Sequence, residues 1–314
     1  MTRSIEGRRD AGNMKPVRIA CVGHAALDHV FEVERFPTVA TKTPAHRYRA
    51  GTGGMAFNAA IAAARLGAAV RMIGRVGDEA GVQMLRDRLR REGIEDRALE
   101  SVRGAMTSVS AIVVDSAGER QIFNHRGDAI ARAHALDTRV LGGADVVLAD
   151  PRWVEGALAA LRWAREQRVI SVFDADVAPA ADLRRLVPLA QWAVFSEPGL
   201  AAYAAQCDTE AGLSQALHDG CEVAMVTRGA RSVMWMRRGG APQQLSVPAV
   251  EAVDTTAAGD VFHAALAVAL GERMVERVAV GFAATAAAIK CLRGPGVLGA
   301  PTRSQLEAAM DQPR

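Results

Sequence analysis

The most informative stretch of the chain covers residues 254–266 and reads Asp254-Thr-Thr-Ala-Ala-Gly-Asp260-Val-Phe-His-Ala-Ala-Leu266. Ala257, Ala258 and Gly259 are small enough to let backbone N–H groups approach an anion closely, and the helix behind them adds the positive end of its dipole. Asp260 then lies beside the anion, where its carboxylate can accept the proton of an attacking hydroxyl. The stretch therefore predicts a phosphate-binding loop that ends on a catalytic base.

A simpler interpretation of this stretch is that Asp254 and Thr255 cap the helix and Asp260 is an ordinary first-turn acid. A second motif favours the chemical interpretation. Gly51-Thr-Gly-Gly-Met-Ala-Phe-Asn58 opens an alanine-rich helix, and Ile73-Gly-Arg-Val-Gly-Asp78 follows it. A glycine cluster alone is weak evidence, but both motifs together indicate a ligand site.

Buried strands and helices alternate along the chain. We expect strands over residues 17–22, 70–73, 145–148, 169–173, 193–195 and 223–227, separated by helical segments such as 55–66 and 82–91. Such alternation predicts an α/β fold with a doubly wound, mostly parallel sheet.

Two stretches, residues 30–50 and 107–124, break that rhythm. The second contains two short apolar runs around a Ser-Ala-Gly turn and is typical of a β-hairpin. If both stretches pair in a small antiparallel sheet, they form a lid that excludes water from the site. We place this lid at about residues 29–52 and 105–126 of one domain spanning 15–314, with 1–14 as a disordered tail.

Composition excludes several classes of protein. The 314 residues are 50% hydrophobic and 23% charged, and the formal net charge of +3 is spread along the chain, so nucleic-acid binding is not implied. The apolar run 261–270 is too short for a membrane span. Four cysteines lie far apart without a Cys-x-x-Cys pair, which argues against a zinc site or disulfides and favours the cytoplasm.

Taken together, the motifs resemble the two signatures of the PfkB, or ribokinase-like, carbohydrate kinase family. They occur in the family's order, about 200 residues apart, and the resemblance covers nearly the whole chain. It extends through Gly23-x-x-x-x-Asp28 and Val226-Thr-Arg-Gly229. The resemblance implies a ribokinase-like three-layer α/β/α sandwich with a β lid, which would phosphorylate a sugar with ATP and Mg²⁺ and would form a homodimer.

The resemblance also assigns roles to individual residues. Asp260 would be the base, with residues 257–259 around the phosphate. The sugar would be held by Asp28, Gly53, Gly54 and Asn58, and ATP by Thr227, Gly229 and Gly259. Asp254 and Thr256 fall where relatives build a potassium site.

Three positions depart from the family pattern. Where relatives often carry Asn-x-x-Glu, this chain has Ser196-Glu197-Pro-Gly199, so we expect Ser196 and Glu197 near ATP and Glu197 near Mg²⁺. Ribokinases proper carry a lysine and an asparagine where this chain has Met55 and Ala26. Ribose is therefore not the acceptor that we expect.

Within the family, the chain is most similar to the sulfofructose kinase branch, which phosphorylates 6-deoxy-6-sulfofructose at its first carbon. The similarity lies in phrases such as Asp145-Val-Val-Leu-Ala-Asp-Pro-Arg-Trp153 and Phe195-Ser-Glu-Pro-Gly-Leu200. Lys42, Asn124 and Arg152 match the residues that surround the sulfonate there. Two cations and an amide donor also suit a permanent anion on chemical grounds.

Alternatives remain open. Lys42 could be a solvated lid residue, and Arg152 could pair with Asp150 or Glu155. The acceptor could be another ketose, a ketoaldonate or a nucleoside. A sugar- or nucleotide-binding regulator without activity is a different class, and the intact residues 257–260 argue against it.

Overall fold

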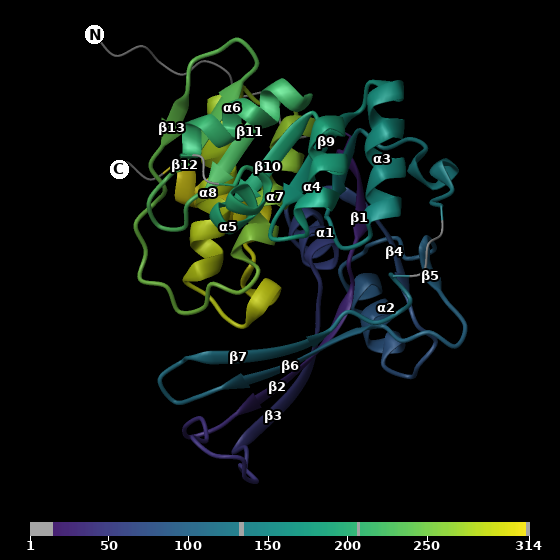
Figure 1. Cartoon of the computed structure of the whole chain (residues 1–314), viewed down its shortest axis with the longest axis vertical. Coiled ribbons are helices and arrows are strands. Elements are labelled where there is room, and N and C mark those ends of the chain that lie inside the picture. The colour runs from purple at the N-terminus through teal and green to yellow at the C-terminus, as the bar shows by residue number, and fades with distance from the viewer. Residues whose placement is uncertain (1–14, 132–134, 206–207, 312–314) are drawn as a thin grey trace.

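The computed structural model describes residues 15–131, 135–205 and 208–311, so the predicted tail and Cys207 lie outside the described residues. A nine-stranded sheet crosses the centre in the order β13-β12-β11-β10-β9-β8-β1-β4-β5 (Figure 1). Its strands are β1 (Arg18–Gly23), β4 (Ala69–Val76), β5 (Leu99–Ser101), β8 (Val146–Ala149), β9 (Ile170–Ala175), β10 (Trp192–Ser196), β11 (Val223–Thr227), β12 (Val233–Arg237) and β13 (Gln243–Leu245).

The large sheet is parallel from β5 to β11, and only β12 and β13 at one edge are antiparallel. All six predicted strands occur in it. Along β1, Ile19 and Cys21 point into one half of the core and Ala20 and Val22 into the other. Burial on both faces explains the continuous apolar runs of these strands.

Helices cover both faces of this sheet, as the sequence predicts. One face packs against α1 (Met55–Arg65), α2 (Val82–Arg91), α7 (Ala258–Gly271), α8 (Glu276–Cys291) and α9 (Arg303–Met310). The other packs against α3 (Val154–Gln167), α4 (Ala180–Leu186), α5 (Glu197–Tyr203) and α6 (Thr209–Asp219). Short 3₁₀ turns η1 (Thr138–Leu141), η2 (Val187–Leu189) and η3 (Gly296–Gly299) complete the elements. No helix in the described ranges is both long and apolar enough to span a bilayer.

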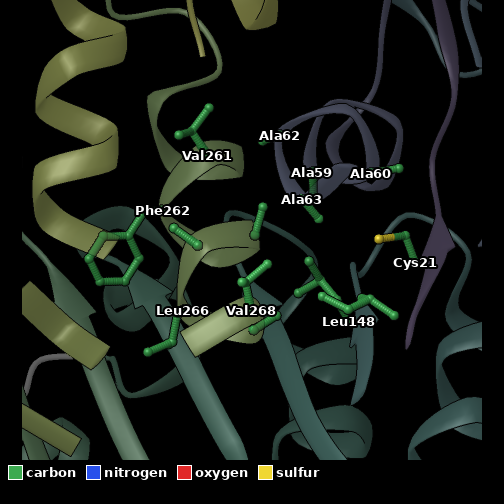
Figure 2. Close-up of a cluster of buried hydrophobic side chains, with 14 of the residues drawn as sticks. Cys21, Ala59, Ala60, Ala62, Ala63, Leu148, Val261, Phe262, Leu266 and Val268 are labelled. Carbon is green, nitrogen blue, oxygen red and sulfur yellow. The ribbon is translucent and has the colours of Figure 1, made fainter. Parts of the chain in front are cut away.

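Two alanine-rich helices, α1 and α7, pack directly against each other. Ala59, Ala62 and Ala63 of α1 belong to one buried cluster with Val261 and Leu266 of α7, and Val261 lies next to Ala62 (Figure 2). Side chains as small as alanine let the two helices approach closely, and close packing fixes their relative position. The alanine richness of the sequence thus serves to join the two glycine-containing motifs.

A four-stranded sheet, in the order β3-β2-β6-β7, lies below the large sheet in Figure 1. It contains β2 (Ala26–Glu32), β3 (Arg47–Gly53), β6 (Ser108–Val114) and β7 (Arg120–His125). The predicted β6–β7 hairpin is confirmed. The prediction of a wholly antiparallel sheet is wrong, because the central strands β2 and β6 run parallel. Each follows parallel strands of the large sheet, β1 before β2 and β4–β5 before β6, so both enter from the same side.

Candidate functional site

A cavity of about 380 Å³ opens between the small sheet and the carboxyl ends of β1, β8 and β9. Ligands of open α/β sheets bind at this end of the strands. Eight of the predicted site residues line the cavity: Asp28, Gly54, Asn58, Asn124, Arg152, Thr256, Ala257 and Asp260. The structure therefore gathers residues from both motifs around one space.

Asp260 lies in the first turn of α7, facing α1. Its Oδ2 accepts a hydrogen bond of 2.7 Å from Nδ2 of Asn58. The Oδ1 atom of Asn58 is buried and has no hydrogen-bond partner within the described residues. That acceptor is free for a hydroxyl donor of a ligand. A carboxylate and an unused amide oxygen thus adjoin each other on the cavity wall.

Burial and a neighbouring acid raise the pKa of the Asp260 carboxyl group toward neutrality. Burial, followed by the charge of nearby Asp174, raises the pKa of Asp260 to about 8. Asp174 is itself buried, and burial together with the charges of Asp176 and Asp150 raises its pKa well above the usual range. An aspartate whose pKa lies near neutrality is suited to exchange a proton with a substrate.

His263 and Asp150 hold the backbone around this acidic cluster. Nδ1 of the buried His263 is 2.6 Å from the carbonyl oxygen of Gly259, and Nε2 is 3.4 Å from Asp174. Asp150 accepts hydrogen bonds from the backbone N–H groups of His24, Ala56 and Arg152. It therefore ties together the ends of β1 and β8 and the start of α1.

Asp28 stands above the glycine motif. A Cβ atom on Gly53 would lie 2.2 Å from Oδ2 of Asp28, so only glycine leaves room for this carboxylate. Gly54 has a φ of +103°, and a Cβ there would lie 2.4 Å from the carbonyl oxygen of His24. Burial raises the pKa of Asp28, while a hydrogen bond with Ser110 opposes the shift. The two glycines thus avoid steric clashes at this part of the site, and Asp28 supplies a polar group to the cavity wall.

Positive charge also lines the cavity. Arg152 donates to the carbonyl oxygen of Val177 at 2.7 Å and lies 3.6 Å from Asp176. Arg126 also lines the cavity and has no carboxylate within ion-pair distance in the described parts of the chain. Nδ2 of Asn124 donates to Ser110 Oγ at 3.1 Å. The exposed Lys42, by contrast, does not line this cavity.

A second cavity, of about 350 Å³, lies on the other side of the loop before α7. Thr227 and Gly229, from the end of β11, line it together with Ala258 and Gly259. Most of its remaining wall is apolar, with contributions from Val233, Val247, Pro248, Val250, Phe262 and Ala284. An apolar slot beside backbone N–H groups at a helix start suits a flat base that carries phosphates.

The loop before α7 separates the two cavities. Thr256 and Ala257 line the first, and Ala258 and Gly259 line the second. Ala257 is the N-cap of α7 and has a φ of 64°, in the left-handed region that alanine rarely adopts. This backbone conformation turns consecutive residues toward opposite cavities. A group passed from one cavity to the other would cross this loop.

Asp254 anchors the beginning of that loop. Its Oδ1 accepts from the backbone N–H of Thr256 and from Arg120 of β7, both at 2.9 Å. Its Oδ2 accepts from the backbone N–H of Gly296 at 2.7 Å. Burial alone would raise the pKa of Asp254, but the hydrogen bonds from Thr256 and Gly296 and the Lys290 charge hold this pKa well below its usual range.

Ser196 and Glu197 line neither cavity. Ser196 caps α5, accepts from the N–H of Gly199 and donates to Oδ1 of Asp176 at 2.7 Å. Glu197 forms an ion pair with Arg231. Their predicted contacts with ATP and Mg²⁺ stay predictions.

Comparison with known proteins shows the family to which the chain belongs. The model of the pfkB family carbohydrate kinases matches residues 17–303. The chain belongs to this family. It is 28% identical over 295 residues to the ribokinase of Bacillus subtilis, covering 92% of this chain and 98% of that one. This pfkB kinase is therefore an ATP-dependent phosphotransferase whose acceptor is a hydroxyl group of a sugar.

Solved structures agree with the fold. An Agrobacterium tumefaciens protein is 34% identical, with a TM-score of 0.87 over 94% of this chain and 98% of that chain. The ribokinase of Arabidopsis thaliana, solved with ribose and ATP, has a TM-score of 0.85 at 22% identity, over 96% and 100% of the two chains. The predicted ribokinase-like fold is confirmed.

Three titratable residues of the cavity wall were not predicted from the sequence. His24 lies within the Gly23-x-x-x-x-Asp28 motif, Arg126 follows Asn124 by two residues, and Asp176 follows the end of β9. Polar residues directly after predicted strands were the available signal, because carboxyl ends of parallel strands meet at one edge. Burial lowers the pKa of His24, which favours the neutral form of its imidazole.

Proposed function

We propose that this pfkB kinase phosphorylates an anionic sugar, and that the sugar is 6-deoxy-6-sulfofructose, converted to its 1-phosphate. The observation that carries the proposal is that Arg126 and Arg152 line the same cavity as Asp28 and Asp260. A small space lined by carboxylates and arginines suits an acceptor whose hydroxyls donate to the carboxylates and whose anionic group pairs with the arginines. The ribokinases named above support a sugar as the acceptor, but not an anionic one.

Asp260 would act as the general base. Its carboxylate takes the proton of the acceptor hydroxyl as that oxygen attacks the γ-phosphorus of ATP. Backbone N–H groups at residues 257–259, together with the start of α7, would stabilise the charge on the phosphoryl oxygens. Asn58 orients Asp260 through its 2.7 Å hydrogen bond, and its free Oδ1 would accept from a sugar hydroxyl.

ATP fits the second cavity by its chemistry, with apolar side chains for the base and the loop amides for the phosphates. Mg²⁺ commonly takes only one or two protein carboxylates and completes its shell with phosphate oxygens and water. When bound, it would neutralise charge on the transferring phosphate. Glu197 is our candidate for contact with it, provided that the Arg231 ion pair opens.

The cationic wall suits a sulfonate. A sulfonate carries a permanent charge on three acceptor oxygens, and guanidinium groups present several N–H donors in a fixed plane. Arg126 has no carboxylate to neutralise it in the described ranges, and Arg152 has only the 3.6 Å contact with Asp176. Asn124 would supply an amide donor. Lys42, on the exposed segment between β2 and β3, would have to move inward to join them.

The acceptor test compares initial rates with ATP and Mg²⁺ for 6-deoxy-6-sulfofructose, fructose 6-phosphate, fructose, ribose, 2-keto-3-deoxygluconate and adenosine. We expect the sulfosugar to have the highest kcat/KM. Arg152→Ala and Arg126→Ala should each raise its KM by about tenfold or more, with less effect on fructose. Arg139→Ala, which removes an exposed arginine paired with Asp137, is the matched control.

A neutral sugar or a nucleoside with the highest kcat/KM would refute the proposed acceptor while leaving the kinase assignment in place. Ribose is the specific rival, because the Bacillus subtilis relative is a ribokinase. Fructose 6-phosphate above the sulfosugar would keep the anionic acceptor and change its identity. Full turnover in Asp260→Asn would refute the proposed base.

A further inference from the structure

A buried lysine lies directly behind the loop that separates the two cavities. Lys290, in the last turn of α8, has no solvent-exposed surface. Its Nζ lies 2.5 Å from the carbonyl oxygen of Asp254, 3.3 Å from that of Arg293 and 3.4 Å from Oδ2 of Asp254. A lysine is rarely buried completely unless its charge is paired.

The surroundings of Lys290 require a cation. All three neighbours are acceptors, and an ammonium group has three N–H donors and no acceptor, so it suits this shell: it donates to the two carbonyl oxygens and forms an ion pair with the carboxylate. Burial lowers the pKa of Lys290, and the Asp254 carboxylate opposes that shift. The position near the carboxyl end of α8 also places positive charge at the negative end of a helix dipole.

Backbone carbonyl oxygens beside a carboxylate form the kind of oxygen shell that holds a potassium ion. Asp254 and Thr256 are the residues for which the family resemblance implies such an ion. In this chain, however, Oδ1 of Asp254 already accepts from Thr256 and Arg120, and Oδ2 from Gly296 with Lys290 beside it. The donor set therefore does not fit a free monovalent cation.

We propose that the Lys290 ammonium group is a built-in substitute for a monovalent cation, positioning the phosphate-binding loop so that the enzyme works without potassium. The loop is attached to this end of α8 by more than the lysine. The N–H groups of Val253 and Asp254 both donate to the carbonyl oxygen of Cys291, at 2.8 and 3.2 Å. Lys290 is a positioning residue, since it acts on the phosphate site through the Asp254 backbone and carboxylate.

The first test uses the unaltered enzyme. Turnover and melting temperature are measured at equal ionic strength in sodium, potassium, ammonium or tetramethylammonium chloride. We expect the same turnover and the same melting temperature in all four salts. Saturable activation by potassium, or a potassium-specific rise in melting temperature, would overturn the proposal. The melting arm needs no acceptor, so it is independent of the proposed sulfosugar.

The second test removes the ammonium group in two ways. Lys290→Ala opens the space, and we expect turnover to fall on the order of ten- to a hundredfold and to recover with potassium or ammonium but not tetramethylammonium. The same ions should raise its melting temperature. Lys290→Met fills the space with an apolar chain, so it should lose turnover without recovery.

Wild-type turnover in Lys290→Ala without potassium would contradict the proposal, as would equal recovery of both variants in any salt. If neither variant folds, the salt dependence of the unaltered enzyme decides alone. Any acceptor that gives turnover serves in these assays, because the loop binds phosphate irrespective of the sugar.

Discussion

Nδ2 of Asn58 donates a 2.7 Å hydrogen bond to Oδ2 of Asp260 across the contact between α1 and α7, although 202 residues separate them in the sequence. The bond joins the glycine motif to the phosphate-binding loop. It also lowers the pKa of Asp260 against the larger effect of burial. Asn58 therefore lowers the pH at which the proposed base becomes available.

Asn58→Ala should shift the pH dependence of activity. Without the amide donor, burial and the Asp174 charge raise the pKa of Asp260 further, so the carboxylate forms only at higher pH. We expect the rising limb of kcat/KM to move to higher pH and its plateau to fall. Steady-state kinetics from pH 6 to 10 would show this. Gln83→Ala, at an exposed site on α2, is the control, and an unchanged limb would contradict the prediction.

Asp260→Asn should abolish turnover while stabilising the fold at alkaline pH. The folded-state pKa of about 8 lies above the ordinary value of 3.8, so the folded chain binds a proton more tightly than the unfolded chain does. The free energy of unfolding due to this group therefore falls as pH rises from about 4 to 8.

The asparagine avoids that loss. We expect it to raise the free energy of unfolding by on the order of 1–3 kcal/mol at pH 8, with the gain disappearing near pH 4. Urea denaturation at both pH values measures it. ATP binding should persist, and a variant less stable than wild type at pH 8 would show that the carboxylate is not held in an unfavourable setting.

Gly53→Ala should disable sugar binding, whereas Gly51→Ala should not. A Cβ at position 53 would lie 2.2 Å from the Asp28 carboxylate, whereas the nearest atom to a Cβ at position 51 would be the Asp28 carbonyl oxygen, at 4.0 Å. Both glycines lie on β3, so the two variants differ mainly in the clash with the Asp28 carboxylate. We expect a rise in the sugar KM of about tenfold or more for Gly53→Ala alone. Equal kinetics for the two variants would contradict this.

Arg120→Met should weaken sugar binding more than it slows the chemical step. Arg120 of β7 binds Asp254 at 2.9 Å and also contacts the Thr256 hydroxyl, linking the small sheet to the phosphate-binding loop. The pair is partly exposed, so its effect on the free energy of unfolding should stay below about 1 kcal/mol.

Separate measurement of KM and kcat tests whether Arg120 links the small sheet to the phosphate-binding loop. A raised KM for the sugar with kcat within about threefold of wild type would fit a contact that holds the small sheet over the cavity. Arg185→Met removes another partly exposed arginine, paired with Glu155 on the far face, and serves as control. A fall in kcat with unchanged KM would assign Arg120 to the chemical step instead.

Much of the fold is predictable from sequence because its strands are buried on both faces. The run around Cys21 and the segment around Val226 are apolar throughout, which is typical of parallel strands. The two antiparallel strands β12 and β13 were not predicted, since residues such as Arg237 and Gln243 are exposed and break the apolar pattern. The parallel pairing of β2 with β6 depends on how the chain enters the small sheet.

The site was predictable where a motif itself forms the wall, as at Asn58 and Asp260. It was not predictable where the sheet register brings distant residues together. Arg126 reaches the cavity because β7 pairs with β6, which the local sequence around it does not reveal. Lys290 looks like a surface residue of an alanine-rich helix, and only the chain folding back at residues 253–254 buries it.

The loop between the cavities couples the binding of the two ligands. Thr256 and Ala257 form part of one wall while Ala258 and Gly259 form part of the other, so a ligand that orders the loop on one side changes the surface offered on the opposite side. The two ligands must then affect each other's affinity by the same factor. A nucleotide would tighten the hold on the sugar as much as the sugar tightens the hold on the nucleotide.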